Sequence, residues 1–121
     1  MNSTEPKPQE RRRLKRRYLA FFTRVYDRNS GQMLGHLDNV STEGAMIIGQ
    51  FPIQSGQTFR LRMDLSEYIF GKAHLDFDAI SAWCQPDLDP TFYNTGLKFI
   101  DIAPDDMEII EKIMTEYVIH E

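Results

Sequence analysis

Arginine dominates a short stretch near the start of the chain. Residues 11–17 read Arg-Arg-Arg-Leu-Lys-Arg-Arg, so six of these seven side chains are cationic. A guanidinium group makes paired hydrogen bonds to a phosphate or to the O6 and N7 edge of a guanine, and it stacks on a purine face. Arg12 and Arg16 lie four residues apart, as do Arg13 and Arg17, so a chain wrapped around a small anion presents two such groups to it. The pattern predicts an arm that meets an anionic partner.

The charges of the chain are unevenly distributed. Residues 1–17 carry seven basic and two acidic side chains, a net charge of +5, whereas residues 18–121 carry seven basic and sixteen acidic ones, a net charge of −9. A basic arm on an acidic body indicates that the arm is the part that contacts an anion. A solvated, disordered tail is the alternative that an arginine run by itself leaves open.

A second polar stretch, Asn39-Val40-Ser41-Thr42-Glu43-Gly44, lies about 25 residues beyond the arm, at a strand boundary. Taken alone it is typical of a plain turn, in which Asn and Ser bond the local backbone and Gly supplies a positive φ. The same residue types could also hydrogen-bond a ligand. The stretch by itself therefore favours the turn and leaves the binding site open.

Residues that could support catalysis or hold a metal do not cluster. His36, His74 and His120 are scattered, and the single cysteine, Cys84, excludes an internal disulfide and a cysteine-based zinc site. No glycine-rich phosphate loop or nucleophile elbow occurs in the sequence. We predict that the protein is not an enzyme, with no catalytic residue, no metal and no cofactor.

Size and composition are those of one ordinary globular domain of 121 residues, 41% hydrophobic and 26% charged. The first seventeen residues contain no apolar segment of a secretory signal, and no later run approaches the roughly 18 apolar residues of a membrane span. We predict a cytoplasmic protein that is not inserted in a membrane.

A series of short strands must position the two polar stretches. Alternation is clearest where Phe59, Leu61 and Met63 alternate with polar residues. The pattern is less regular from Ile80 to Cys84, which a β-bulge would explain. Six strands are predicted, over residues 19–26, 32–40, 45–48, 58–65, 73–84 and 93–102.

The hydrophobic period becomes helical at Pro104. Proline followed by Asp105 and Asp106 is a helix start, because the missing N–H has no partner there and the carboxylates meet the positive end of the dipole. An apolar face follows at spacings of three and four, so the helix would cover a small antiparallel barrel. The predicted organisation is a flexible leader (1–10) and a single domain (11–121) with a basic arm (11–17), a barrel (18–102) and a helix (104–119).

Together, the two polar stretches resemble a known family. An RxxxR segment before the first strand, followed by [D/N]-x-S-x-x-G near the third, is similar to the signature of PilZ domains, which are bacterial receptors for the second messenger cyclic di-GMP. The resemblance covers roughly residues 10–118 and includes Gly35, Gly56, the Ala82-Trp83-Cys84 segment and Tyr93-x-x-Gly96-x-x-Phe99. It implies an all-β fold with a C-terminal helix, a six-stranded antiparallel barrel that binds cyclic di-GMP without catalysis.

The resemblance also implies which residues bind the ligand. The RxxxR positions fall on Arg12 and Arg16, while Arg13 and Arg17 form an overlapping register and Arg11 is a further candidate. The second motif falls on three residues that would bond a guanine edge or a phosphate and let the backbone come close, namely Asn39, Ser41 and Gly44.

The leading hypothesis is thus a cyclic di-GMP receptor whose arm is mobile when free, folds over the barrel with ligand, and signals through a protein partner. Two alternatives remain, a degenerate PilZ-like protein-interaction module and a β-barrel that uses its basic arm on RNA or DNA. The acidic body and the lack of aromatic residues among the arginines argue against nucleic acid. Monomer and homodimer are both left open.

Overall fold

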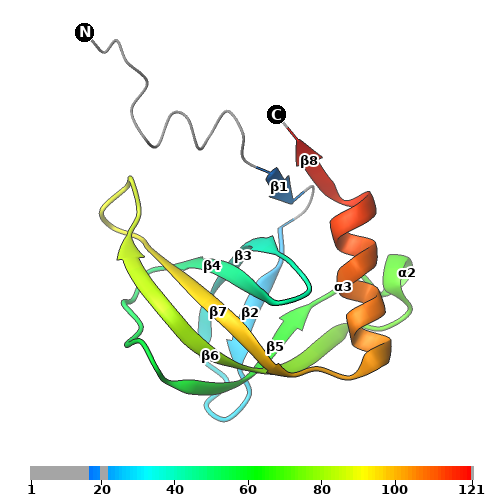
Figure 1. The fold of residues 1–121 in the computed structure, drawn as a ribbon, viewed down its shortest axis with the longest axis horizontal. Coiled ribbons are helices and arrows are strands. Elements are labelled where there is room, and N and C mark those ends of the chain that lie inside the picture. Colours follow the sequence, from blue (N-terminus) through cyan, green and yellow to red (C-terminus); the bar gives the residue numbers. More distant parts are fainter. Residues whose placement is uncertain (1–16, 20–21, 121) are drawn as a thin grey trace, which may run out of the picture.

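The computed structural model describes residues 17–19 and 22–120 of the chain. Its centre is a closed barrel of six antiparallel strands in the order β2-β3-β4-β7-β6-β5 (Figure 1). The barrel strands are β2 (Arg24–Asp27), β3 (Met33–Val40), β4 (Gly44–Gly49), β5 (Thr58–Asp64), β6 (His74–Pro86) and β7 (Tyr93–Asp101). The predicted fold class, an antiparallel six-stranded barrel with a C-terminal helix, is confirmed.

The predicted first strand, residues 19–26, is wrong as one element. Strand β1 (Arg17–Leu19) ends at the first residue of this region and pairs antiparallel with β8 (Val118–His120), whereas β2 begins only at Arg24. Between them Thr23 belongs to neither strand; its carbonyl accepts the Leu37 N–H and its hydroxyl donates to the Asp64 carbonyl. Strand propensity is similar on both sides of Thr23, so it cannot show that the two segments have different partners.

The C-terminal helix, α3 (Pro104–Glu116), begins at the predicted residue but ends before the predicted 119. Tyr117 caps it by donating its N–H to the Ile113 carbonyl, and residues 118–120 form β8. A short helix, α2 (Glu67–Phe70), was missed, since four residues cannot show a helical period. Within the described part of the chain, neither helix has the length and apolar composition needed to cross a bilayer.

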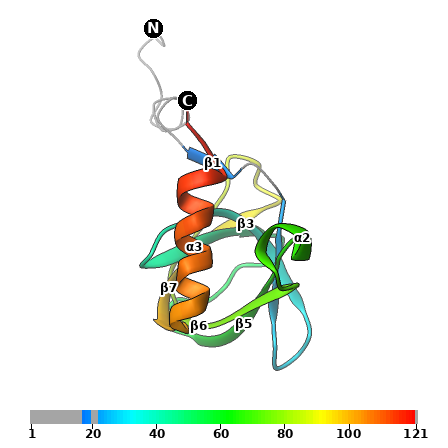
Figure 2. The ribbon, with the colours of Figure 1, turned by 90° about the vertical axis from the view of Figure 1, so that its right-hand side faces the viewer.

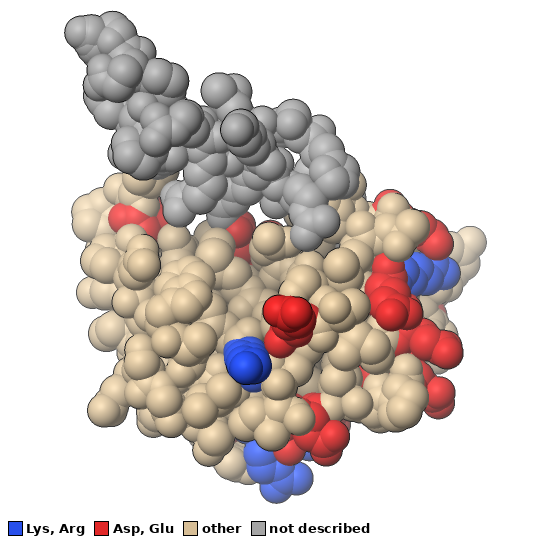
Figure 3. Space-filling view, in the orientation of Figure 1, with Lys and Arg blue, Asp and Glu red and all other residues tan. Residues whose placement is uncertain are grey.

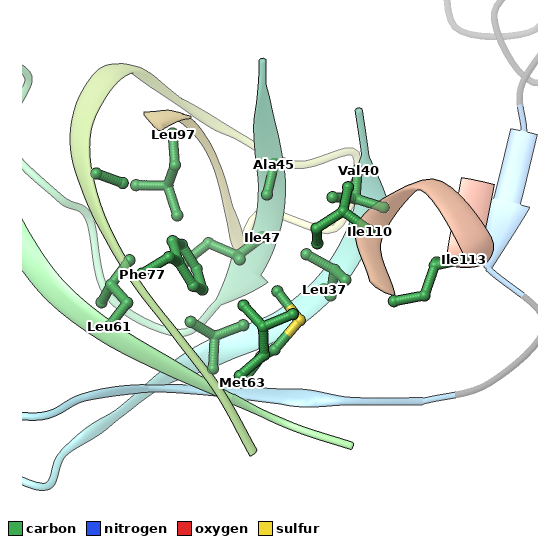
Figure 4. Packing of buried hydrophobic residues seen from close by; sticks show 13 residues of the cluster. Leu37, Val40, Ala45, Ile47, Leu61, Met63, Phe77, Leu97, Ile110 and Ile113 are labelled. Carbon is green, nitrogen blue, oxygen red and sulfur yellow. The ribbon is translucent and has the colours of Figure 1, made fainter. Parts of the chain in front are cut away.

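The hydrophobic core fills the barrel, and α3 closes one of its ends. Figure 4 shows Ile110 and Ile113 of α3 entering beside Leu37 and Val40 of β3. Burial of a large apolar side chain contributes about 1.5 to 3 kcal/mol, so this packing holds the helix on the barrel. The buried cluster consists of Val25, Leu37, Val40, Ala45, Ile47, Leu61, Met63, Leu75, Phe77, Ala79, Leu97, Ile110 and Ile113.

An ion pair also fastens α3. The buried carboxylate of Asp106, in the first turn of the helix, accepts a hydrogen bond of 2.7 Å from the Lys72 ammonium, which raises the pKa of Lys72. The opposite side of α3 is exposed and acidic, with Glu108, Glu111 and Glu116. Figure 3 shows acidic side chains gathered on the side of the molecule where α3 lies, and Figure 2 shows the helix in front of the barrel, across the end that it closes.

The outer face of β6 carries two carboxylates, Asp76 and Asp78. Arg62 binds Asp76 through two hydrogen bonds of 2.8 and 3.2 Å, and Arg28 binds Asp78 at 2.8 Å. The hydrogen bond from Arg62 holds the pKa of Asp76 below its usual value. Both carboxylates therefore pair with arginines that fasten neighbouring segments of the barrel.

Candidate functional site

A groove of about 470 Å³ lies over the β3–β4 turn and the neighbouring strands β7 and β6. This volume falls within the about 300 to 1,000 Å³ that is typical of small-molecule sites. All three residues predicted from the second motif line it. The lining consists of Asn39, Val40, Ser41, Glu43, Gly44, Ala45, Met46, Ala82, Trp83, Gly96, Leu97 and Lys98.

Four residues of the groove form one row across the sheet. Their backbones pair from β3 through β4 and β7 to β6 in the sequence Asn39, Met46, Gly96, Trp83. Residues far apart in the chain thus meet in one row because the strand order places β7 between β4 and β6.

Two β-bulges place the side chains at the two ends of this row, Asn39 and Trp83, on the outer face of the barrel. The strand register shifts between Leu37 and Asn39 in β3, and again between Ser81 and Trp83 in β6. Each bulge adds one residue, so the alternation of inward and outward side chains is reset. As a result Asn39 and Trp83 lie on the outer face while Ser81 and Val40 remain buried. The bulge expected near residues 80–84 is confirmed.

The β3–β4 turn is held by its own polar atoms. The Ser41 N–H donates to the Gly44 carbonyl at 2.8 Å, and the Ser41 Oγ accepts the Glu43 N–H at 3.1 Å. The Asn39 Oδ1 accepts the Val40 N–H at 2.9 Å. The side chains of Asn39 and Ser41 take part in these bonds as acceptors, so the Asn39 amide N–H groups and the Ser41 hydroxyl hydrogen are donors that the turn can offer a ligand.

Gly44 is required for close packing of two strands. The positive φ that the turn interpretation assigned to glycine is wrong here, since the described glycines with positive φ are Gly31, Gly56 and Gly71. A Cβ on Gly44 would instead lie well under 3.0 Å from the Leu97 carbonyl oxygen, a separation that real Cβ atoms essentially never show. Gly44 therefore lets β4 approach β7 closely.

Sequence reasoning did not assign Trp83 or Lys98 to the site. The indole of Trp83 lies over Gly96, where an added Cβ would collide with the ring, and the side chain is 38% exposed. Lys98 is exposed and pairs with Gly44 in the strand register, so it brings a cation to the groove. The groove thus combines a flat ring, hydrogen-bond donors and a positive charge, which suits a planar anionic ligand.

We expect Gly96→Ala to displace Trp83. The added methyl group would displace the indole ring from its position over residue 96, so the fluorescence emission of this single tryptophan should change. The free energy of unfolding should fall by about 1 to 3 kcal/mol. Fluorescence spectra and thermal melts measure both effects. In a Trp83→Ala background the same substitution should cost little stability, because the ring is gone. An unchanged spectrum and melting temperature in Gly96→Ala would contradict this packing.

The structure describes one of the five arginines predicted to bind the ligand, Arg17. Arg11, Arg12, Arg13 and Arg16 lie outside the described residues. Arg17 begins β1, whose pairing with β8 sets the backbone at the end of the arm beside the C-terminal end of α3 (Figure 1). The structure therefore brings the second motif together and leaves its relation to the first motif untested.

Other chemistry finds little support among the described residues. Over 17–19 and 22–120, no three His, Cys, Asp or Glu residues are grouped so that they could hold a metal ion. The Cys84 sulfur accepts hydrogen bonds from the Ile53 N–H at 3.4 Å and from the Thr95 hydroxyl at 3.5 Å. Cys84 therefore has a structural role, linking β6 to β7 and to the segment after β4.

One family model matches most of the chain. A sequence model described as PilZ domain matches residues 10–116. Among curated proteins, no sequence matches the chain.

Three solved structures have similar folds. The inhibitor of motility MotI/DgrA from Bacillus subtilis is 18% identical with a TM-score of 0.65, and the match covers 91% of this chain and 55% of that one. The PilZ domain of YcgR from Escherichia coli, solved with c-di-GMP, is 15% identical with a TM-score of 0.59, covering 86% and 90%. MrkH from K. pneumonia, in its c-di-GMP complex, is 17% identical with a TM-score of 0.59, covering 84% and 50%. The chain thus spans about half the length of MotI and MrkH, and at these identities the likeness is one of fold.

Proposed function

The chain belongs to the PilZ domain family, and from this premise we propose that it is a receptor for cyclic di-GMP. The observation that carries the proposal is the groove in which Asn39, Ser41 and Gly44 meet Trp83 and Lys98. Two structures with the same fold, YcgR and MrkH, were solved with this nucleotide, which supports the choice of ligand. As a second-messenger receptor the protein would act in the cytoplasm, as a monomer or a homodimer.

Each side of the groove suits one part of a cyclic dinucleotide. The Asn39 amide can donate to the O6 and N7 acceptors of a guanine, and the ring of Trp83 can stack on a base, a contact worth about 1 to 3 kcal/mol. The Ser41 hydroxyl and the Lys98 ammonium can donate to a phosphate. In this proposal the nucleotide lies along the row of residues that crosses β3, β4, β7 and β6.

The arm supplies the remaining contacts in this proposal. Arg12 and Arg16 would bind phosphate and guanine through charge-assisted hydrogen bonds, with Arg11 as a further contact. The alternative is that Arg13 and Arg17 make these contacts in place of Arg12 and Arg16, and single substitutions distinguish the two pairs. The body of residues 18–121 has a net charge of −9, so without the arm it would repel the ligand.

Calorimetric titration tests the function directly. We expect cyclic di-GMP to bind with a modest dependence on salt, and to change the emission of Trp83, while GTP binds weakly. A short RNA is the control for the nucleic-acid alternative, in which each phosphate contact would add about −0.7 to the slope of log K against log salt. Tight, steeply salt-dependent RNA binding without cyclic di-GMP binding would overturn the proposal.

We also propose that the arm folds over the groove when the nucleotide binds. The six cations of residues 11–17 repel one another, and the two phosphates of the ligand would relieve that repulsion. Hydrogen exchange should therefore slow at the arm amides when ligand is added, while the amides of Leu61 and Met63, which are buried in β5, serve as the control. Equal exchange at the arm in both states would contradict the folding step but not the binding.

A PilZ-like module that binds only protein is the second candidate. Glu43 favours it, because this carboxylate belongs to the groove lining and would lie near an anionic ligand. If titration with cyclic di-GMP gives neither heat nor a fluorescence change, a module that binds only protein is favoured. In either case the output would pass to a protein partner.

A further inference from the structure

Glu43 is the one acidic residue among the described residues that line the groove. The other polar side chains of the lining are suited to donate. The Oδ1 of Asn39 and the Oγ of Ser41 already accept backbone N–H groups, which leaves their own hydrogens for a ligand, and Lys98 is a cation. The carboxylate of Glu43 is a pure acceptor in a groove of donors, so it suits a part of the ligand that carries N–H groups.

The backbone holds Glu43 at the edge of the groove. Its N–H donates to the Ser41 Oγ at 3.1 Å, and its carbonyl accepts the Phe99 N–H at 2.9 Å. The next residue, Gly44, approaches β7 so closely that no side chain fits there. Both polar groups of the Glu43 backbone are therefore engaged, and its side chain extends from a fixed point between the β3–β4 turn and β7.

The carboxylate of Glu43 is not engaged by a cation of the protein. Asp76, Asp78 and Asp106 each form an ion pair with an arginine or lysine. Lys98 lies across the strand pair from the residue that follows Glu43, yet in the part of the chain that the structure describes these two opposite charges form no ion pair. The Glu43 side chain is exposed. Both charges are thus available to different parts of one ligand.

Guanine has a matching set of donors. Its O6 and N7 accept hydrogen bonds, and these are the atoms assigned above to the Asn39 amide. Its N1–H and its 2-amino group lie side by side on the adjoining edge, where the two oxygens of a carboxylate can accept both hydrogens. Adenine has a lone pair at N1 and no amino group at C2, so the same carboxylate would face an acceptor. One carboxylate can therefore attract guanine and reject adenine.

We propose that Glu43 determines the base specificity of the groove, by accepting the N1–H and 2-amino hydrogens of the guanine whose O6 and N7 face Asn39. This inference rests on the proposed cyclic di-GMP binding and adds the residue that selects guanine. The negative charge of Glu43 then favours an anionic ligand, because a direct charge-assisted hydrogen bond exceeds a repulsion from more distant phosphates that water weakens. The two effects predict opposite results when the charge is removed.

Calorimetric titrations of the full chain with cyclic di-GMP and with cyclic di-AMP test the assignment. The wild type should prefer cyclic di-GMP about tenfold or more. Glu43→Ala should bind cyclic di-GMP about 10- to 150-fold more weakly, the usual loss for a hydrogen bond to a charged group, and should bind cyclic di-AMP equally well or better. Glu43→Gln, which keeps one acceptor oxygen, should fall between. Thermal melts should be unchanged, since the backbone bonds of residue 43 remain.

Two controls isolate the hydrogen bonds from the charge. Glu108→Gln removes one negative charge from an exposed position of α3, outside the groove, and should leave both affinities unchanged. The inosine analogue of cyclic di-GMP lacks the 2-amino groups. It should bind the wild type more weakly than cyclic di-GMP does, whereas Glu43→Ala should bind the two ligands with nearly equal affinity, because the partner of the amino group is gone.

The possible failures are distinguishable. If Glu43→Ala binds cyclic di-GMP as tightly as the wild type or more tightly, the carboxylate only repels the phosphates, and the inference is overturned while the receptor function stands. Equal losses for cyclic di-GMP and cyclic di-AMP in Glu43→Ala would also overturn it, because the residue would then not select a base. A wild-type chain that binds neither nucleotide would overturn the proposed function together with this inference.

Discussion

Replacing Arg12 or Arg16 with alanine should weaken cyclic di-GMP binding about 10- to 150-fold. The loss corresponds to about 1.5 to 3 kcal/mol, the usual contribution of a hydrogen bond to a charged group. The melting temperature of the free protein should hardly move, because the buried cluster is made by the barrel and α3. Titration calorimetry paired with thermal melts of each variant measures both quantities.

The other arginines provide the controls for this result. Arg60→Ala removes an exposed arginine of β5 that does not line the groove, so it should leave the affinity unchanged. If both Arg12→Ala and Arg16→Ala bind with unchanged affinity, the ligand contacts are assigned to Arg13 and Arg17 instead. Unchanged affinity in the alanine variants of all four of these arginines and in Arg11→Ala would exclude the arm from the site.

Gly44→Val should damage the scaffold as well as the site. The new side chain would collide with the Leu97 carbonyl, a backbone atom that cannot move without shifting β7, so we expect a loss of at least about 1 to 3 kcal/mol of stability. Ligand affinity should fall in the same variant, since the groove lies on these strands. Ser41→Ala should behave differently, weakening binding through the lost hydroxyl with little change in melting temperature.

Thermal melts with matched ligand titrations separate these cases. Thr42→Val places the same side chain two residues earlier, on an exposed position of the same turn, and should leave the melting temperature nearly unchanged. If Gly44→Val melts at the wild-type temperature, the close approach of β4 to β7 is not required for stability. If Ser41→Ala keeps full affinity, its hydroxyl serves only the turn.

Much of the fold could be predicted because its signals are local. The alternation around Leu61 and the proline that begins α3 each act within a few residues, and both elements begin where they were expected. The errors concern pairings over long distances. Val118 and its neighbours fit either a helix or a strand by propensity, and only the presence of β1 beside them selects the strand.

The site was predictable to a similar extent. Asn39, Ser41 and Gly44 came from a motif, and the structure brings them together in one groove. Trp83 and Lys98 were missed because their place depends on the pairing of β7 with β4 and β6 and on a bulge whose position the sequence left uncertain. The role of Gly44 was predicted only in part, since a collision with Leu97 needs the three-dimensional neighbour.

The pairing of β1 with β8 has a consequence for the order of folding. It joins two strands of three residues each from opposite ends of the described chain, so nearly the whole chain must close as a loop before any of its few hydrogen bonds can form. Contacts of such high sequence separation form slowly, and a ladder this short has little to resist opening. We therefore expect the barrel to fold first and this ladder to form last. In the native state it would open on its own, releasing the base of the arm from α3 while the barrel stays closed.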